Sequence, residues 1–299
     1  NTRYTISGSV RLDKSNLYGS AARDRAVPLF STGIGWIISS EHFYEVRWLP
    51  ELKFRLTYGT SGNSPTNVAS ISTISRGGLN PNGDPVNSIN NPPLHSLRWE
   101  RIGTLNAGLN FRTKNNFLYG SVDLYMRKAS DLVGLSRVDY TTGTYSMTGN
   151  HAAMTSHNLD VLLNIEMMAK PIEWRTTLLF TFLNEAVTEY QDTLYPAWRY
   201  TDPQDLAIAR NKPLYPVFSF PYRGLDQLGN PYGLLNGGKS QDYLSIVGRS
   251  GYNDLIYHGR STPAIFGMLT NHIGWKSFTL SISAQYKFNY YFRRYSANY

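Results

Sequence analysis

The sequence predicts an all-β protein, a transmembrane antiparallel β-barrel with long extracellular loops. Three observations indicate this fold class. Apolar and polar residues alternate over segments of about ten residues, which is the length a tilted strand needs to cross hydrocarbon, whereas soluble strands usually run ~5–6 residues. Short turns and long loops alternate between these segments. Aromatic residues make up 14% of the chain, and amphipathic rings suit a surface that is apolar on one side and wet on the other.

The alternation predicts the strands one after another, about nine or ten in all. The segments with the clearest pattern are 3–13, 30–38, 52–60, 104–112, 118–125, 158–167, 173–184 and 278–288. Segment 278–288 is the most regular, because Phe278, Leu280 and Ile282 alternate with Thr279, Ser281 and Ser283. Successive side chains of a strand point to opposite faces, so each segment has one apolar and one polar face.

We expect the apolar faces to meet lipid and the polar faces to line a wet lumen. The aromatic residues predicted to lie on the lipid face or in its interfacial girdle are Tyr4, Trp36, Tyr58, Trp174 and Phe278. The polar residues predicted to face the lumen are Arg11, Arg55, Asn110, Asp123, Asp160 and Glu166. Alternation also occurs in soluble β-sandwiches, where such polar residues would simply face solvent.

Long loops are expected at about 61–96, 134–156 and 186–262, and short turns at 114–116 and 169–171. Loops of this length are uncommon in compact soluble domains. The last loop is rich in aromatic residues, whose faces suit the capture of sugar rings or peptide side chains. The predicted ligand-binding residues are Tyr195, Trp198, Tyr200, Tyr215, Phe218, Tyr222 and Tyr232. The alternative is that they pack within the loop or against a partner lid.

The net charge of +8 leaves several classes of partner open. Nucleic-acid binding would need clustered Lys and Arg, and here the basic residues are spread singly, so we expect no nucleic-acid partner. Attraction to an anionic membrane surface or to lipopolysaccharide fits better. The plainest explanation is that a part of a larger protein can carry any net charge.

Motifs for catalysis or metal binding are missing. The chain has no cysteine, which excludes disulfides and thiolate chemistry, and its six histidines lie outside known nucleophile motifs. Asp160 and Glu166 are ~20 Å apart along one strand, too far for an acid/base pair. Segment 80–84 offers oxygen ligands without EF-hand spacing, so a loop calcium is the one cofactor considered. We therefore expect no catalytic residue and no dedicated metal site.

The ends of the chain suggest a fragment. No window approaches ~18 consecutive apolar residues, so no transmembrane helix is expected. The sequence opens with Asn1-Thr2-Arg3-Tyr4-Thr5, which already has the pattern of a strand and not that of a signal peptide.

Several segments resemble the SusC/RagA family of TonB-dependent outer-membrane transporters of Bacteroidetes. The most specific match is Trp48 to Asn63, which resembles the family's stretch "L-K-x-R-x-S-Y-G-x-T-G-N". The other matching segments are Arg3 to Asp13, Pro28 to Ser39, Trp99 to Arg101 with Asn106 to Phe111, Val122 to Leu132, and Tyr222 to Pro231. Together they span nearly the whole chain.

The resemblance implies that residues 1–299 are part of a barrel of ~22 strands, with the plug domain absent from this chain. It also implies active import of a nutrient, a glycan or a peptide, at the Gram-negative outer membrane, and no enzymatic activity. The implied partners are a SusD-like surface lipoprotein, the TonB–ExbB–ExbD complex acting through an N-terminal part that is absent here, outer-membrane lipid, and a second transporter–lipoprotein pair in a dimer. The alternatives are a small autonomous outer-membrane barrel, acting as an adhesin or hydrolase, and a soluble β-sandwich binding module.

Overall fold

The structure is a computed structural model of the chain, and it describes residues 3–14, 27–64, 72–91, 97–137, 139, 141, 146–169, 171–190, 195–202, 207–249 and 251–293. Parts of the three expected loops lie outside these residues. No helix among the described residues is long and apolar enough to cross a membrane.

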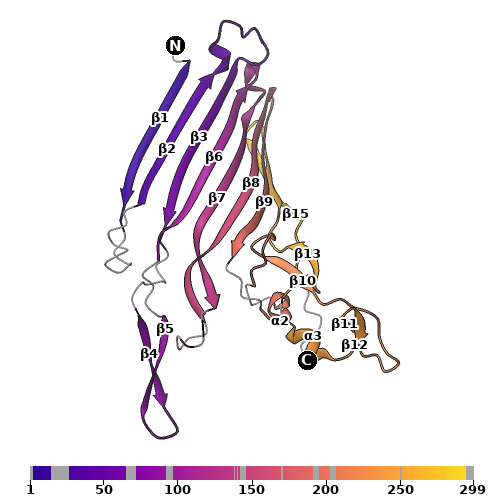
Figure 1. The fold of residues 1–299 in the computed structure, drawn as a ribbon. Coiled ribbons are helices and arrows are strands. Elements are labelled where there is room, and N and C mark those ends of the chain that lie inside the picture. The colour runs from indigo at the N-terminus through magenta and orange to yellow at the C-terminus, as the bar shows by residue number, and fades with distance from the viewer. Residues whose placement is uncertain are drawn as a thin grey trace.

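Nine strands form one antiparallel sheet, which curves away from the viewer toward β15 in Figure 1. In sheet order, the strands are β1 (Tyr4–Asp13), β2 (Val27–Ile37), β3 (Glu51–Asn63), β6 (Glu100–Arg112), β7 (Leu118–Arg137), β8 (Ser146–Ala169), β9 (Ile172–Tyr190), β14 (Ile265–Trp275) and β15 (Phe278–Phe288). Within the described residues β1 and β15 each pair on one side only, so the sheet is open. The predicted all-β barrel fold is confirmed as an unclosed part of a barrel, and the described sheet has nine strands where nine or ten were expected.

The register of the strands divides the sheet into two chemically different faces. Directly paired residues share a face, and one row joins Tyr4, Trp36, Phe54, Leu109 and Val122. The five aromatic residues predicted to meet lipid all lie on the face of this row, which we call the outer face. The six residues predicted to line the lumen all lie on the opposite face, which we call the inner face.

The outer face is apolar and uncovered. Ile6 is 83% exposed, and Phe278 and Ile282 are 73% and 54% exposed. Strand β15 has eleven residues. At about 3.3 Å per residue and a tilt of about 40°, it gives an apolar band roughly 25 Å high. This is the height expected of the lipid-facing band in an outer-membrane barrel.

The turns after β6, β8 and β14 lie at one end of the sheet, together with the β2–β3 connection, and the two longest connections, after β3 and β9, lie at the other end, which we call the long-connection end (Figure 1). The turn between β6 and β7 contains the 3-10 helix η2 (Lys114–Asn116), in which Asn115 has φ 63° and Asn116 has φ 58°. Asparagine tolerates this left-handed conformation better than most residues. The β2–β3 connection contains the 3-10 helix η1 (Ile38–Ser40).

The expected loop at 134–156 is wrong in its bounds. Strands β7 and β8 stay paired as far as Arg137 and Ser146, so the connection covers only 138–145. A bulge between Ala129 and Val133, with Asp131 at φ 58°, shifts the register. The shift breaks the period-two pattern, which made the distal half of the hairpin look irregular in the sequence.

The other two expected loops contain secondary structure. The first contains a hairpin of β4 (Thr73–Leu79) and β5 (Pro85–Asn91). The second forms a small lobe, which we call the loop lobe, from the described residues 195–202, 207–249 and 251–262. Its elements are α2 (Ala197–Thr201), β10 (Pro216–Ser219), β11 (Gly233–Leu235), β12 (Gly238–Ser240), α3 (Tyr243–Gly248) and β13 (Ile256–Arg260).

A buried ion pair joins the loop lobe to the end of β9. The Arg260 side chain is only 8% exposed, and its Nη2 donates to Glu185 Oε1 at 2.8 Å. Its Nη1 donates to the Leu183 carbonyl oxygen at 2.6 Å, and its Nε donates to Thr262 Oγ1 at 3.2 Å. The guanidinium therefore has an anionic partner and hydrogen-bond acceptors, which offset the cost of removing its charge from water.

We predict that Arg260→Met in the full-length protein loosens the loop lobe, because the largely buried Glu185 carboxylate would lose its cation. Removing one partner of a buried pair costs about 3–5 kcal/mol, so hydrogen exchange of peptides covering 214–222 and 256–262 should accelerate strongly. The control is Arg249→Met. Arg249 Nη2 lies 3.0 Å from Asp254 Oδ2, and the Asp254 side chain is 53% exposed, so losing this ion pair should cost about 1 kcal/mol or less. Equal exchange in the two variants would contradict the anchoring role.

Candidate functional site

An ionic network across three strands crosses the middle of the inner face. Arg55 on β3 donates from Nε to Asn110 Oδ1 at 2.7 Å and from Nη2 to the Asp123 carboxylate at 3.0 and 3.3 Å. Asn106 Nδ2 donates to the same carboxylate at 3.2 Å. The network links β3, β6 and β7 across the wall of the sheet.

Gly108 makes this network possible. The register places Gly108 between Arg55 and Asp123 in one row. A Cβ at this position would overlap the Asp123 carboxylate and come within 2.8 Å of Arg55 Nη2. The two long side chains therefore meet above a strand that has no side chain there. Sequence reasoning named Arg55 and Asp123 singly, and only the register shows that they are partners.

Two carboxylates face each other in the same row. Asp123 on β7 is the direct cross-strand partner of Asp160 on β8. Like charges placed opposite each other repel, and here Arg55 neutralises one of them while Thr181 Oγ1 donates to Asp160 at 2.8 Å. The sequence placed these aspartates on different strands but gave no register, so their pairing was missed.

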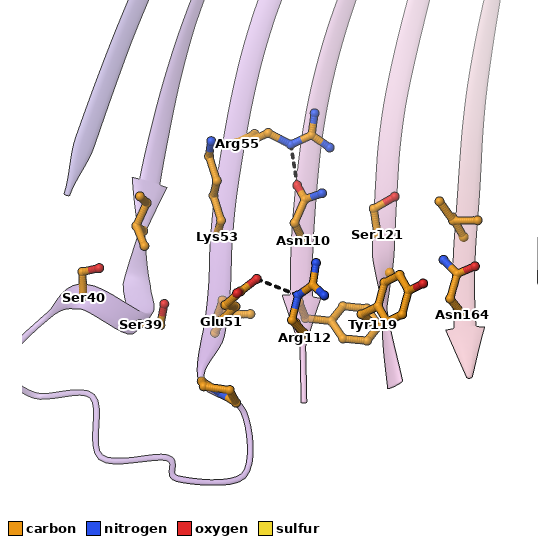
Figure 2. Close-up of a pocket in the computed structure, with 16 residues that line it drawn as sticks. Ser39, Ser40, Glu51, Lys53, Arg55, Asn110, Arg112, Tyr119, Ser121 and Asn164 are labelled. Atoms are coloured by element: carbon orange, nitrogen blue, oxygen red, sulfur yellow. Dashed lines mark hydrogen bonds and ion pairs between the residues drawn. The ribbon is translucent and has the colours of Figure 1, made fainter. Parts of the chain in front are cut away.

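A cavity of about 780 Å³ lies beside this network, toward the short-turn end of the sheet. Figure 2 shows its polar lining, in which Arg55 contacts Asn110 and Glu51 contacts Arg112. Arg112 Nε donates to Glu51 Oε2 at 2.9 Å, and its guanidinium lies 4.9 Å from the centre of the Tyr119 ring. Sequence reasoning did not single out Lys53, Arg112 or Tyr119, although all three occupy polar positions of the alternation.

Charge on the inner face is largely paired. The Tyr119 hydroxyl donates to Glu166 Oε1 at 2.8 Å, and Arg175 Nε contacts the same oxygen at 2.7 Å. Arg11 pairs with Asp13 at 2.8 Å on β1. Lys53 lines the cavity without an acidic partner among the residues that the structure describes. This arrangement provides a hydrated, hydrogen-bonding wall and not a set of reacting groups.

A second hollow of about 480 Å³ interrupts the polar character of the inner face over β8, β9 and β14. Its apolar lining comes from Leu162, Leu179, Phe266 and Met268, beside Asp160 and Thr181. These apolar residues occupy positions where strict alternation predicts polar ones.

Three of the predicted ligand-binding aromatic residues form the core of the loop lobe. Tyr195, Tyr200 and Phe218 are 7%, 3% and 1% exposed and pack with Ala207 and Ala209. The Tyr200 and Phe218 ring centres are 5.9 Å apart at a steep angle. This corrects the prediction for these three residues, because their ring faces are covered by one another and not available to a ligand.

The remaining four aromatic residues lie at or near the lobe surface. Tyr222 is 63% exposed, Trp198 and Tyr215 are also exposed, and Tyr232 is half-buried with Lys239 Nζ 6.0 Å from its ring centre. These residues keep the chemistry that suits ligand contact.

A tight turn in the loop lobe, over residues 226–230, is held by Asp226. Its Oδ1 accepts from the amides of Leu228 at 2.9 Å and Asn230 at 2.7 Å, and its Oδ2 accepts from Gln241 Nε2 at 2.8 Å. Hydrogen bonds donated by Gln241, which has the largest effect, and by Asn230 lower the pKa of Asp226 from 3.8 to about 2. Gly229 at φ 87° closes the turn.

The described residues contain no group of three or more His, Asp or Glu side chains arranged to hold a metal ion. At 80–84, the turn considered for calcium, Asn80 Oδ1 already accepts from the amides of Asn82 at 3.0 Å and Asp84 at 2.8 Å.

Known proteins similar to this chain are transport proteins of the bacterial envelope. The sequence matches the family described as "TonB dependent receptor-like, beta-barrel" over residues 1–298. It is 27% identical over 197 residues to the TonB-dependent receptor SusC of Bacteroides thetaiotaomicron, covering 62% of this chain and 19% of that protein. It is also 27% identical over 202 residues to the TonB-dependent receptor P39 of Formosa agariphila, covering 64% and 18%.

Among solved structures, the fold is similar to that of the RagAB peptide transporter. The TM-score is 0.77 at 22% identity, over 95% of this chain and 32% of that chain. A second structure of the same system, the RagAB peptide importer in a closed-closed state, gives a TM-score of 0.75 at 23% identity, over 96% and 32%. The chain thus spans about a fifth of the length of its curated relatives and about a third of these structures.

We predict that Arg55→Met destabilises the sheet in the full-length protein by about 1–3 kcal/mol, because Asp123 loses its charged donor while facing Asp160. Adding Asp123→Asn should recover part of this loss, which a double-mutant cycle of denaturant unfolding in detergent would measure. The matched control is Arg11→Gln, whose exposed pair with Asp13 should contribute less than about 1 kcal/mol. If the changes in unfolding free energy of Arg55→Met and Asp123→Asn simply add in the double variant, the two residues are not coupled.

We predict that the Asp226 turn of the loop lobe persists until the pH falls well below 4. Because the folded-state pKa of Asp226 lies below its unfolded value of 3.8, its contribution is complete above about pH 4 and is lost as the pH falls toward 2. Carboxyl carbon shifts of labelled aspartate should titrate with a midpoint near 2 for Asp226. Gln241→Ala should raise that midpoint, and an unchanged midpoint would contradict the assignment.

Proposed function

The chain belongs to the TonB-dependent receptor β-barrel family, and from this premise we propose that the whole protein imports a nutrient across the outer membrane, with these residues forming part of the barrel wall. Proteins of this family are transporters of the Gram-negative outer membrane and not enzymes. The observation that carries the proposal is the sheet itself. Its outer face is an exposed apolar band, and its inner face is a charged and hydrogen-bonded wall.

The open edges of the sheet support a place within a larger barrel. Strands β1 and β15 each leave a row of backbone groups without a partner in the described sheet. Such groups cannot remain unpaired in hydrocarbon. Further strands on both sides would pair with them, as the ~22-stranded barrels of outer-membrane transporters require.

The polar inner wall suits the passage of a hydrated solute. Side chains such as Lys53, Arg55 and Asn110 present donors to the lumen beside the larger cavity. Paired charges keep the wall wet without a strong field of one sign, since Arg55 and Arg112 are neutralised by Asp123 and Glu51. Transport along such a wall breaks no bond in the substrate.

The similarity to SusC supports a more specific proposal. We infer that a SusD-like surface lipoprotein covers the long-connection end of the barrel and captures a glycan or a peptide together with exposed loop aromatics. In this proposal Trp198, Tyr215, Tyr222 and Tyr232 supply ring faces to the ligand. The TonB–ExbB–ExbD complex would act through the part of the protein that lies outside this chain, and two such pairs would form a dimer.

The structure disfavours the two alternatives from the sequence. An autonomous barrel would need β1 to pair with β15, and the described residues of these strands are not neighbours in the sheet. A soluble β-sandwich would bury one face of the sheet against a second sheet. The outer face is uncovered instead, with Ile6 and Phe278 among its exposed residues.

The decisive experiment uses the full-length gene product in its native host. Deleting the gene should abolish uptake of fluorescently labelled oligosaccharides or peptides that serve as its nutrient. Complementation should restore uptake, and a protonophore should stop it, because TonB draws on the inner-membrane gradient. Uptake that persists with the gradient collapsed would overturn active import.

The loop aromatics have a separate test. The double variant Trp198→Ala, Tyr222→Ala should weaken ligand binding by about 1–3 kcal/mol, since each aromatic contact contributes about 0.5–1.5 kcal/mol. The control is Tyr200→Phe, which keeps the buried ring and should leave affinity unchanged. Calorimetry on the purified transporter–lipoprotein complex would measure both, and equal affinities would remove these residues from the ligand site.

A further inference from the structure

Two cations lie side by side on the outer face near the long-connection end. Arg101 on β6 pairs with Ser130, and Gly103 pairs with Lys128 on β7. Arg101 and Lys128 are therefore diagonal neighbours on one face, about 7–8 Å apart. Both side chains are exposed.

Their position marks the edge of the apolar band. On the same two strands, Leu105 pairs with Met126, and both are exposed on the outer face. Lys128 lies two residues beyond Met126, which is about 7 Å along the strand. The outward residues thus change from apolar to cationic where a membrane's hydrocarbon would give way to its headgroups.

A hydroxyl and a glycine complete the arrangement between the two cations. The Tyr58 hydroxyl lies 3.3 Å from where a Cβ of Gly103 would be, so it rests over the one position in this row without a side chain. On the other side of Lys128, its cross-strand partner is Thr155 on β8. Donors from three strands, those of Tyr58, Arg101 and Lys128, therefore lie around Gly103.

Arg101 and Lys128 lack the carboxylate partners that three arginines of the inner face have. The neighbouring outward positions are Thr60, Gly62, Ser130, Thr155 and His157, none of which is acidic. On the inner face, by contrast, Arg55, Arg112 and Arg175 each contact a carboxylate. Within the part of the chain that the structure describes, Arg101 and Lys128 form no ion pair.

We propose that Tyr58, Arg101 and Lys128 bind the phosphate group of a lipid in the extracellular leaflet of the outer membrane. A guanidinium donates two hydrogen bonds to a phosphate, and an ammonium adds a point charge. The Tyr58 hydroxyl is a third donor. The lipid is favoured over free phosphate because Leu105, Leu124 and Met126 continue the site as an exposed apolar surface, which acyl chains would cover. This proposal does not depend on which nutrient is imported.

The test uses full-length protein purified from outer membranes in mild detergent, with co-purified phosphorus-containing lipid counted by native mass spectrometry. The double variant R101Q/K128Q should retain much less lipid, roughly 25-fold less if each cation contributes about fivefold. The matched control is R127Q, which removes the neighbouring cation on the opposite face, where Arg127 lies 4.8 Å from the Tyr125 ring centre. R101K/K128R keeps both charges and should retain lipid.

Equal lipid retention in wild type and R101Q/K128Q would overturn the proposal, as would equal loss in R127Q. Heat-modifiable migration of each variant on gels confirms that its barrel is folded, so that loss of lipid is not loss of fold. A second arm titrates delipidated protein with dihexanoyl phosphatidic acid and with inorganic phosphate. Tighter binding of the lipid supports the proposal, and equal binding of inorganic phosphate would make this a free-anion site and overturn it.

Discussion

The pairing of backbone amides and carbonyls is the constraint on which the rest of this structure depends. Hydrocarbon supplies no hydrogen bonds, so each spanning strand must pair on both sides. Antiparallel pairing of nine strands meets this requirement inside the sheet. It also forces successive side chains to opposite faces, so that one sequence supplies a lipid-facing surface and a water-facing surface at the same time. The separation of apolar and polar residues follows from this backbone geometry.

Charge is handled differently on the two surfaces. On the inner face the register brings opposite charges into contact, and Gly108 gives Arg55 and Asp123 the room to meet. Arg55 and Asp123 are only partly exposed, so their pairing both organises the wall and stabilises the sheet. On the outer face cations occur where the apolar band ends, without acidic neighbours. The same residue type thus has two roles, set by which side of the strand it occupies and by how far along it lies.

Much of the sheet could be predicted from the sequence, because alternation is a local property that survives wherever a strand has no bulge. Alternation therefore predicted strand β15 and the placement of Tyr4 and Trp36 on the face opposite to Arg55. Prediction failed between Ala129 and Val133, where an extra residue shifts the phase. Register is a non-local property, so the facing of Asp123 and Asp160 had no signal in the sequence. Nor does composition separate Tyr200 in a core from Tyr222 on a surface, because both lie in a loop of similar character.

The loop lobe has a small core of its own, built from rings such as Tyr200 and Phe218 and tied to β9 by Arg260. A loop that becomes ordered only on binding pays for that ordering with conformational entropy, which lowers the affinity. Here the ordering has already occurred during folding. A solute that binds the surface of this lobe would therefore meet preorganised contacts. The rate of its capture would be set by diffusion and desolvation and not by the slower closing of a flexible segment.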